Sequence, residues 1–252
     1  MDKRIVITGA SQGIGAELAL QLVRAGHQLV LSARHEDELV AVARRIGGDA
    51  RAVAADLTCR ADVDRLRDEA LRLLGHVDVW INNVGRGINR PVMDLTEDDV
   101  DLMVAVNVKS ALYGMQAIVP HFMERGAGHL INVSTFLSRV PVASYRSAYS
   151  GAKAMLNILT ENLRMDLREA HPNVRVSLVL PGMVSTEFAI HALGGPPSGG
   201  LVAATPAQSA ADVAREIISL IEQPQAERYT NPALSELVTR RFADPLTQMN
   251  DG

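Results

Sequence analysis

The chain has 252 residues, 47% of them hydrophobic and 21% charged, which excludes a disordered or collagen-like protein and leaves enough chain for a large core. Twenty-five basic and 29 acidic residues leave a net charge of −4 with no long run of either sign, so nucleic acid is not expected as a partner.

Short β-branched runs alternate with segments of helical period along most of the chain. Strands are predicted at 4–8, 29–31, 51–54, 77–81, 129–134 and 174–180, with a less marked seventh at 228–230. Helices are predicted at 14–25, 37–46, 61–74, 96–124 and 147–170, and Thr96 is the expected N-cap of the fourth. Apolar strands separated by helices predict a parallel sheet covered on both faces. The expected fold is therefore a single doubly wound α/β domain, residues 1–252, with about seven strands.

The residues between the first strand and first helix are Thr8-Gly9-Ala10-Ser11-Gln12-Gly13-Ile14-Gly15. Glycines permit a tight turn and let backbone N–H groups approach a pyrophosphate, while the helix N-terminus supplies positive potential. The alternative is a strand-to-helix turn that binds no ligand. The position between strand and helix predicts a dinucleotide site, with Gly9, Ser11, Gln12, Gly13, Ile14 and Gly15 as its residues.

This glycine pattern resembles that of the short-chain dehydrogenase/reductase family, in its one-domain branch with a Rossmann fold. The resemblance covers nearly the whole chain, because further family motifs follow in order up to about residue 187. It implies an oxidoreductase that uses a nicotinamide dinucleotide.

The end of the second strand decides the expected coenzyme. An acidic residue there would bind the adenosine ribose and favour NAD, but this chain has Ala33 followed by Arg34. A guanidinium can clamp a 2′-phosphate with two charge-assisted hydrogen bonds. NADP(H) is therefore favoured and NAD(H) is the alternative. Gln12 is an argument against NADP(H), because some NADP-binding relatives have a second basic residue in the glycine turn and this chain has a neutral glutamine there.

Other cofactor residues are carried over from the resemblance. Asp56 and Leu57 match the pair that borders adenine, and Asn83 and Gly85 lie in Asn82-Asn83-Val84-Gly85, which is similar to the family's Asn-Asn-Ala-Gly. Pro181, Gly182, Val184 and Thr186 match the segment that contacts the nicotinamide carboxamide. Without the resemblance, these segments would be a helix N-cap and ordinary turns.

Tyr149 and Lys153 are four residues apart on a predicted helix, so their side chains share a face. A nearby ammonium lowers the pKa of a phenol, which otherwise lies near 10. In the family this pair provides the acid–base tyrosine and a lysine that also binds the nicotinamide ribose. Tyr145 lacks such a lysine and is expected to line the pocket or pack locally.

The resemblance implies two further catalytic residues. A hydroxyl at the end of the fifth strand should hold the substrate oxygen, and the sequence leaves Thr135 and Ser134 open, with strand register favouring Thr135. The loop to Tyr149 is then one residue longer than usual. Asn107 matches the asparagine that kinks a long helix and supports a water leading to the lysine. A buried, hydrogen-bonded amide is the alternative interpretation of Asn107.

The sequence thus predicts reversible hydride transfer between NADP(H) and a carbonyl or secondary alcohol. The alternatives are an NAD-dependent dehydrogenase and a cofactor-binding scaffold or redox sensor with little activity. Residues 187–204, which include the Gly/Pro-rich stretch 194–200, are expected to form a mobile apolar loop over the substrate. The tail 231–252 carries no motif that we could interpret.

The remaining expectations concern partners and location. Relatives associate through their long helices, so a homodimer or homotetramer is expected by analogy. The single cysteine, Cys59, cannot form an intrachain disulfide, and no leader-like segment precedes the first strand, which favours a cytoplasmic location. No run of about 18 apolar residues predicts a membrane span, and the seven histidines lack metal-ligand spacing, so neither membrane nor metal binding is expected.

Overall fold

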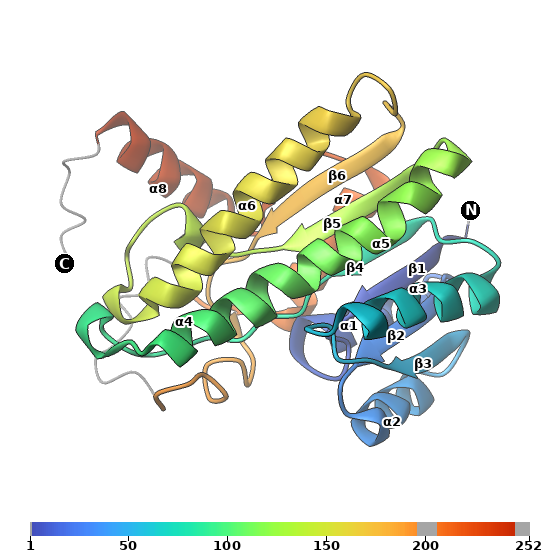
Figure 1. Cartoon of the computed structure of the whole chain (residues 1–252), viewed down its shortest axis with the longest axis horizontal. Helices are drawn as coiled ribbons and strands as arrows, with labels where there is room; N and C mark the ends of the chain where they lie inside the picture. Colours follow the sequence, from blue (N-terminus) through green and yellow to red (C-terminus); the bar gives the residue numbers. More distant parts are fainter. Residues whose placement is uncertain (1, 196–205, 245–252) are drawn as a thin grey trace.

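The computed structural model describes residues 2–195 and 206–244. Its centre is a seven-stranded sheet in the order β3-β2-β1-β4-β5-β6-β9, in which every pair of neighbours is parallel (Figure 1). The strands are β1 (Arg4–Thr8), β2 (Gln28–Ala33), β3 (Ala50–Ala54), β4 (Val79–Asn82), β5 (Gly128–Val133), β6 (Val174–Leu180) and β9 (Glu227–Tyr229). Two short strands, β7 (Val184–Ser185) and β8 (Gln208–Ser209), pair beside this sheet. The predicted α/β fold is confirmed.

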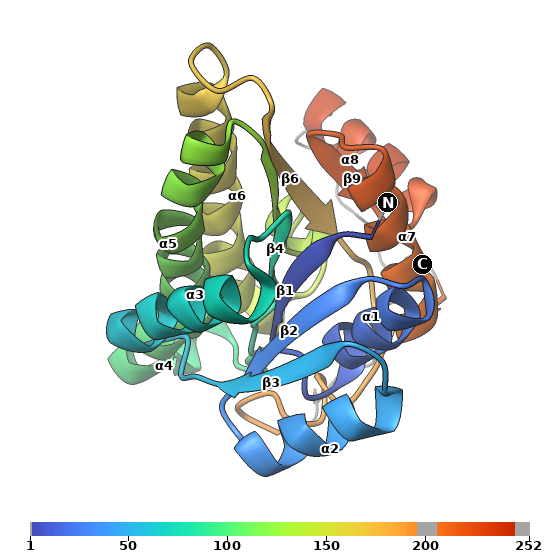
Figure 2. The ribbon, with the colours of Figure 1, turned by 90° about the vertical axis from the view of Figure 1, so that its right-hand side faces the viewer.

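Helices cover both faces of the sheet (Figure 2). They are α1 (Gly13–Arg24), α2 (Glu36–Ile46), α3 (Arg60–Leu74), α4 (Glu97–Val104), α5 (Ser110–Arg125), α6 (Ser147–Leu167), α7 (Ala210–Glu222) and α8 (Pro232–Ala243). One core layer joins the sheet to α1, α2 and α7, and a second joins it to α3, α5 and α6. Strands buried on both faces have to be apolar throughout, which is why they appear in the sequence as continuous β-branched runs.

The helix predicted over 96–124 is present as a continuous helical stretch, Glu97–Arg125, but its middle, Ala105–Lys109, is a π-turn that joins α4 to α5. Thr96 is the N-cap of α4, as expected, and its hydroxyl accepts the Asp99 N–H. Ser110 follows the π-turn, and its hydroxyl donates to the Val106 carbonyl at 2.6 Å. A π-turn widens the helix locally and is frequent at functional sites.

Two helices were not predicted. α7 begins with Ser209 and Asp212, which cap each other reciprocally, and it buries Val213 and Ile217 against the sheet. α8 begins at Asn231, whose side chain accepts the Ala233 N–H, in the part of the tail that had no interpretable motif. Both segments carry capping residues before their first turn, so a local signal was present. Elsewhere the predicted ends differ by up to three residues, as for the strand predicted at 77–81, which begins at Val79 and ends at Asn82.

The order of the strands creates a crevice at one edge of the sheet. β2 lies on one side of β1 and β4 on the other, so the connections after β1 and β4 leave in opposite directions. Ligands of open α/β sheets bind where this reversal occurs, outside the carboxyl ends of the strands. The glycine turn after β1, Asn83 after β4, Thr135 after β5 and Pro181 after β6 all lie at that edge.

Among the described residues, one helical stretch is long and apolar enough to cross a membrane by length and composition. It is Glu97–Arg125, with a mean hydropathy of 1.4 over its most apolar window, and 56% of that window is buried inside the protein. Core helices of soluble proteins meet the same criteria, so this stretch is weak evidence for a membrane span.

Candidate active site

A cavity of about 1010 Å³ opens at the carboxyl ends of the strands. Most of the predicted site residues line it: Gly9, Ser11, Gln12, Gly13, Ile14, Arg34, Asp56, Leu57, Asn83, Gly85, Ser134, Thr135, Tyr149, Lys153, Pro181, Gly182, Val184 and Thr186. Gly15 and Asn107 are not among its lining residues, although both contact residues that are. The tertiary structure therefore brings into one cavity groups that are as much as 177 positions apart in the sequence.

The glycine turn needs its glycines for two different reasons. Gly13 has a φ of +54°, a left-handed conformation that side chains disfavour. A Cβ on Gly15 would lie 2.2 Å from the Gly9 carbonyl oxygen, so no side chain fits there. The turn is held to β4 by Asn83, whose amide donates to the carbonyls of Thr8 at 3.2 Å and Gly9 at 3.0 Å. The result is a fixed, open backbone surface at the N-terminus of α1, which suits a phosphate group.

The end of β2 places Arg34 in the cavity wall. Ala33 ends the strand, and the Arg34 side chain is exposed to solvent with no acidic partner in the described part of the chain. Arg45, on α2, lines the same part of the cavity, which the sequence analysis did not anticipate. Two guanidinium groups therefore face this end of the site.

Asp56 is partly engaged in its own turn. Its Oδ1 accepts the Thr58 N–H at 3.0 Å and the Thr58 hydroxyl at 2.7 Å, the arrangement of an ordinary turn before α3. Asp56 also lines the cavity, as expected of a cofactor residue, whereas the alternative interpretation as a helix N-cap is wrong because the N-cap of α3 is Cys59.

The Tyr149 side chain is 7% exposed and lies at the base of the cavity. Burial raises the pKa of its phenol to about 12, and the Arg146 charge and a hydrogen bond with Thr135 act in the opposite direction. Its ring packs on that of Phe188, with centroids 5.6 Å apart. In this state the phenol is protonated and is a potential proton donor.

Lys153 lines the cavity and is 3% exposed. Its ammonium donates to the Val133 carbonyl at 3.0 Å, and burial lowers its pKa to about 7. The expectation that Lys153 lowers the pKa of Tyr149 has no support here, because the groups that do so are Arg146 and Thr135. No carboxylate of the described residues neutralises this ammonium, so its charge is free to act on a ligand.

The two candidate hydroxyls after β5 have different surroundings. Ser134 donates to the Asn157 side chain at 2.6 Å, and Asn157 donates in turn to Ser138 at 2.7 Å. Thr135 interacts with Tyr149, and its hydroxyl accepts the Leu137 N–H at 3.3 Å. Both residues line the cavity, but the Ser134 hydroxyl is engaged with Asn157, whereas the Thr135 hydroxyl interacts with Tyr149.

Asn107 occupies the π-turn and is fully buried. Its Oδ1 accepts the Arg86 N–H at 3.1 Å, and its amide donates to the Arg86 carbonyl at 3.0 Å. A Cβ on Gly85 would lie 3.3 Å from Asn107 Oδ1 and 3.5 Å from Lys153 Nζ, so this glycine separates the two side chains. Asn107 is a satisfied buried amide that also reaches the region of the lysine.

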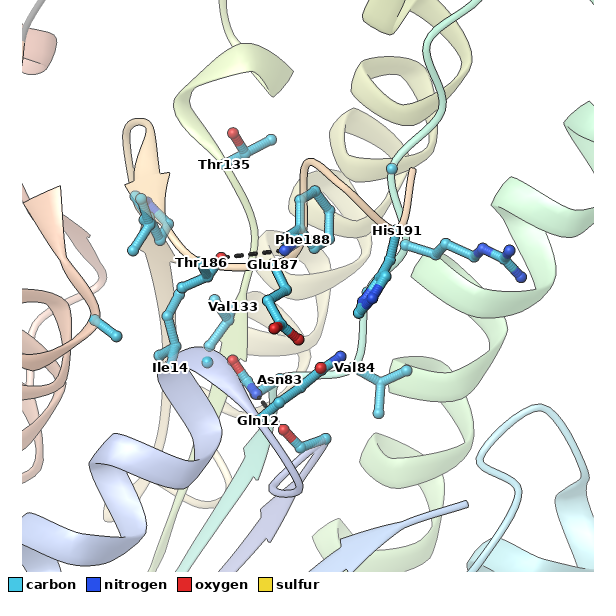
Figure 3. A pocket seen from close by; sticks show the side chains of 18 of the residues that line it. Gln12, Ile14, Asn83, Val84, Val133, Thr135, Thr186, Glu187, Phe188 and His191 are labelled. Carbon is cyan, nitrogen blue, oxygen red and sulfur yellow. Dashed lines mark hydrogen bonds between the residues drawn. The ribbon is translucent and has the colours of Figure 1, made fainter. Parts of the chain in front are cut away.

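The segment after β6 forms the opposite wall. The Thr186 methyl group lies close to the glycine turn, 3.5 Å from where a Cβ of Gly13 would be. The Phe188 N–H donates to the Thr186 hydroxyl at 3.4 Å, and the side chains of Glu187, Phe188 and His191 extend over the cavity (Figure 3). The first part of the predicted loop 187–204 therefore lines the site, and residues 196–204 lie outside the described part of the chain.

The sequence analysis missed Arg146, which is 5% exposed and lines the cavity three residues before Tyr149. Nothing in its sequence context distinguishes it from a surface arginine. Tyr145 does not line the cavity. Its hydroxyl is buried without a hydrogen-bond partner among the described residues, and its ring lies beside the Arg146 guanidinium.

Known proteins with similar sequences and structures agree with this geometry. The family model for short chain dehydrogenases matches residues 3–193. An uncharacterised oxidoreductase of Staphylococcus aureus is 36% identical over 186 residues, which are 73% of this chain and 79% of that protein. A short-chain dehydrogenase/reductase from Burkholderia phymatum in complex with NAD is 27% identical with a TM-score of 0.87, over 100% of this chain and 97% of that chain. One from Burkholderia cenocepacia in complex with NADP is 25% identical with a TM-score of 0.81, over 97% and 94% of the two chains.

Proposed function

Because this chain belongs to the short-chain dehydrogenase/reductase family of oxidoreductases, we propose that it transfers a hydride between NADP(H) and a carbonyl or secondary alcohol. The observation that carries the proposal is the convergence of Tyr149, Thr135 and Lys153 with the glycine turn in one cavity. A protonated phenol, a second hydroxyl and a buried ammonium are the groups that reduction of a carbonyl requires.

The cavity fits a dinucleotide at the glycine turn. The space beside Gly15 admits no Cβ, and the turn presents backbone at the start of α1. Bound there, the nicotinamide supplies or accepts the hydride. Asn83 keeps the turn in place, and Thr186 and Gly13, which lie side by side, would contact the bound cofactor.

Each reacting group has a separate task. Tyr149 donates its proton to the carbonyl oxygen during reduction and accepts one from the alcohol during oxidation. Thr135 donates a hydrogen bond to the same oxygen as negative charge develops on it. Lys153 binds ribose hydroxyls and adds positive charge, and Asn107 holds the backbone beside it. Phe188 packs on the Tyr149 ring and excludes water from the reacting oxygen.

Arg34 supports NADP(H) over NAD(H). Its exposed guanidinium has no acidic partner among the described residues and follows Ala33, where an NAD-specific site would have an acid. Arg34→Ala should weaken NADPH binding by about 10- to 100-fold and leave NADH binding nearly unchanged. Arg44→Ala is the control, because Arg44 is exposed on α2 and does not line the cavity. An equal loss of affinity for NADPH and NADH in Arg34→Ala would contradict the prediction that Arg34 binds the 2′-phosphate.

The proposed activity is tested by initial rates of NADPH and NADH oxidation with a panel of ketones and aldehydes. Tyr149→Phe should keep coenzyme binding and lose at least about 100-fold in turnover. Tyr113→Phe is a matched control on α5, outside the cavity lining. Full activity of Tyr149→Phe would refute the catalytic assignment, and NADPH binding without turnover of any compound would favour the scaffold alternative.

We further propose a cytoplasmic homodimer or homotetramer. Cys59 is a free, exposed thiol, which suits a reducing compartment. The outer face of α6 exposes Met155, Ile158 and Met165, apolar side chains that a second copy could cover. Multi-angle light scattering of the purified protein tests the assembly, and a monomer at micromolar concentration would contradict it.

A further inference from the structure

Arg146 is a buried cation that has no counter-ion among the described residues. Its side chain is 5% exposed, and its Nη1 atom is buried without a hydrogen-bond partner in that part of the chain. Burial lowers the pKa of the guanidinium, and the phenols of Tyr149 and Tyr145 oppose this. Leaving a charge both buried and unpaired is strongly destabilising, so such a group needs a functional explanation.

The surroundings of Arg146 favour a ligand outside the chain itself. Its guanidinium lies beside the rings of Tyr145 and Phe188, 6.0 and 5.9 Å from their centroids. Aromatic faces attract a cation but leave its in-plane N–H donors free. Outside the described part of the chain, residues 196–205 contain no acid, and the acidic side chain of residues 245–252 is that of Asp251.

Gly87 keeps the space around Arg146 open. A Cβ on Gly87 would lie 2.2 Å from Nη1 and 3.0 Å from the Phe188 ring, so a larger residue would displace the guanidinium. Arg146 lines the same cavity as Tyr149, and both pack on the Phe188 ring. An anion on Arg146 would therefore be close to the group that Tyr149 protonates.

We propose that Arg146 binds a carboxylate of the substrate, so that the substrates of this enzyme are carbonyl compounds with a carboxylate a few bonds from the reacting carbon. The inference rests on the proposed function. A carboxylate matches the fork of N–H donors of a guanidinium and carries the single negative charge that one arginine neutralises, whereas a phosphate monoester carries nearly two. In the reaction the carbonyl carbon accepts the hydride of NADPH, the oxygen accepts the Tyr149 proton, and the products are a hydroxy acid and NADP⁺. The carboxylate itself is unchanged.

A different role for Arg146 would give different kinetics. Its charge lowers the pKa of Tyr149, so it could act on every substrate through the phenol alone. In that case loss of Arg146 would slow charged and neutral substrates equally and shift the pH profile of both. As a carboxylate anchor, it acts on the charged substrates alone.

The test compares keto acids with their methyl esters. Benzoylformate, benzoylpropionate and benzoylbutyrate vary the distance between carbonyl and carboxylate, and each ester removes the charge. The wild-type enzyme should prefer one acid of the series over its ester. Arg146→Met should lower kcat/KM for that acid by about 10- to 100-fold and for the ester by less than about 3-fold. Arg146→Lys should retain part of the preference, and Arg168→Met, an exposed arginine at the end of α6, should retain all of it.

A second variant reaches the same site without removing the arginine. Gly87→Ala should reduce the acid preference because its methyl group displaces Nη1. Thermal melting of every variant checks that it folds. An equal loss for acid and ester in Arg146→Met, or no preference for acids in the wild type, would overturn the proposal.

A binding experiment separates this inference from the proposed activity. Calorimetric titration of the NADP⁺ complex with phenylacetate and with phenylacetamide needs no turnover. Tighter binding of the acid that disappears in Arg146→Met supports the anion site even if no ketone is reduced, in which case the proposed activity alone fails. Equal binding of acid and amide by the wild type would overturn the anion site, whatever the activity.

Discussion

Replacing Lys153 by methionine should make the cofactor-free protein more stable and its activity negligible. The Lys153 side chain is 3% exposed, and burial lowers its pKa to about 7. Methionine has a similar length and no charge, so it fits the same space without the cost of burying an ammonium. Lys153 therefore lowers the stability of the folded protein, and we attribute its presence to its action on ligands.

The size of the effect follows from two opposing contributions. A pKa lowered from 10.5 to about 7 corresponds to a cost of about 5 kcal/mol at a pH below 7, at about 1.4 kcal/mol per unit. The hydrogen bond from Lys153 to the Val133 carbonyl, 3.0 Å long, offsets about 1.5–3 kcal/mol of that cost. The net stabilisation expected for Lys153→Met is therefore about 2–3.5 kcal/mol.

The pH dependence is the more specific signature. Between pH 7 and 10.5 the unfolded chain keeps the Lys153 proton that the folded protein has released. Stability rises with pH wherever the unfolded state binds more protons, so the wild type gains up to about 1.4 kcal/mol per pH unit from this lysine. Lys153→Met lacks that gain. Its advantage is largest below pH 7, disappears between about pH 8.5 and 9.5, and reverses above that range.

Urea denaturation of both proteins without coenzyme, at several pH values from 6.5 to 9.5, measures this difference. Lys109→Met is the control, because Lys109 is exposed and should show no such trend. If Lys153→Met is less stable than the wild type at pH 6.5, or if its advantage does not shrink at higher pH, then burial of the Lys153 ammonium does not destabilise the folded protein.

Three further predictions concern single positions. Gly15→Ala should abolish coenzyme binding in a fluorescence titration, because its Cβ would lie 2.2 Å from a carbonyl oxygen, whereas Gly151→Ala meets nothing within 4 Å and should raise the free energy of unfolding by about 0.5–1 kcal/mol. Tight binding by Gly15→Ala would contradict the steric argument. Burial lowers the pKa of His129 to about 4, so the unfolded chain is protonated first as the pH falls. The free energy of unfolding of the wild type should thus fall by up to about 3 kcal/mol between pH 6.5 and 4, and that of His129→Gln should fall by less, as measured by urea titrations. The same pH dependence of unfolding free energy in both proteins would refute the prediction for His129. Thr135→Val should lower kcat by about 100-fold with little change in the melting temperature, whereas Ser134→Ala should mainly destabilise, by about 1–3 kcal/mol, because Asn157 loses its partner. The reverse pattern would assign the catalytic hydroxyl to Ser134.

Much of the fold and part of the site depend on local patterns, and the sequence displays these directly. β6 was predicted with both ends correct, because a buried parallel strand is a continuous apolar run whatever its neighbours are. The glycine turn and the Tyr149–Lys153 pair are also local, since their geometry follows from the spacing within one turn or one helix. α7 and α8 belong to this group too, because Ser209, Asp212 and Asn231 are capping residues that stand before them in the sequence.

The tertiary structure decided what depends on distant partners. Ser134 and Thr135 are neighbours in the sequence and both line the cavity, but the Ser134 hydroxyl bonds to Asn157, 23 positions away, whereas Thr135 interacts with Tyr149. Asn107 finds its partner at Arg86, across the π-turn that periodicity does not predict. Arg146 looks like any charged residue until the packing of Gly87 and Phe188 buries it. Burial and the absence of a counter-ion are properties of the surrounding volume, and residues from several elements create that volume together.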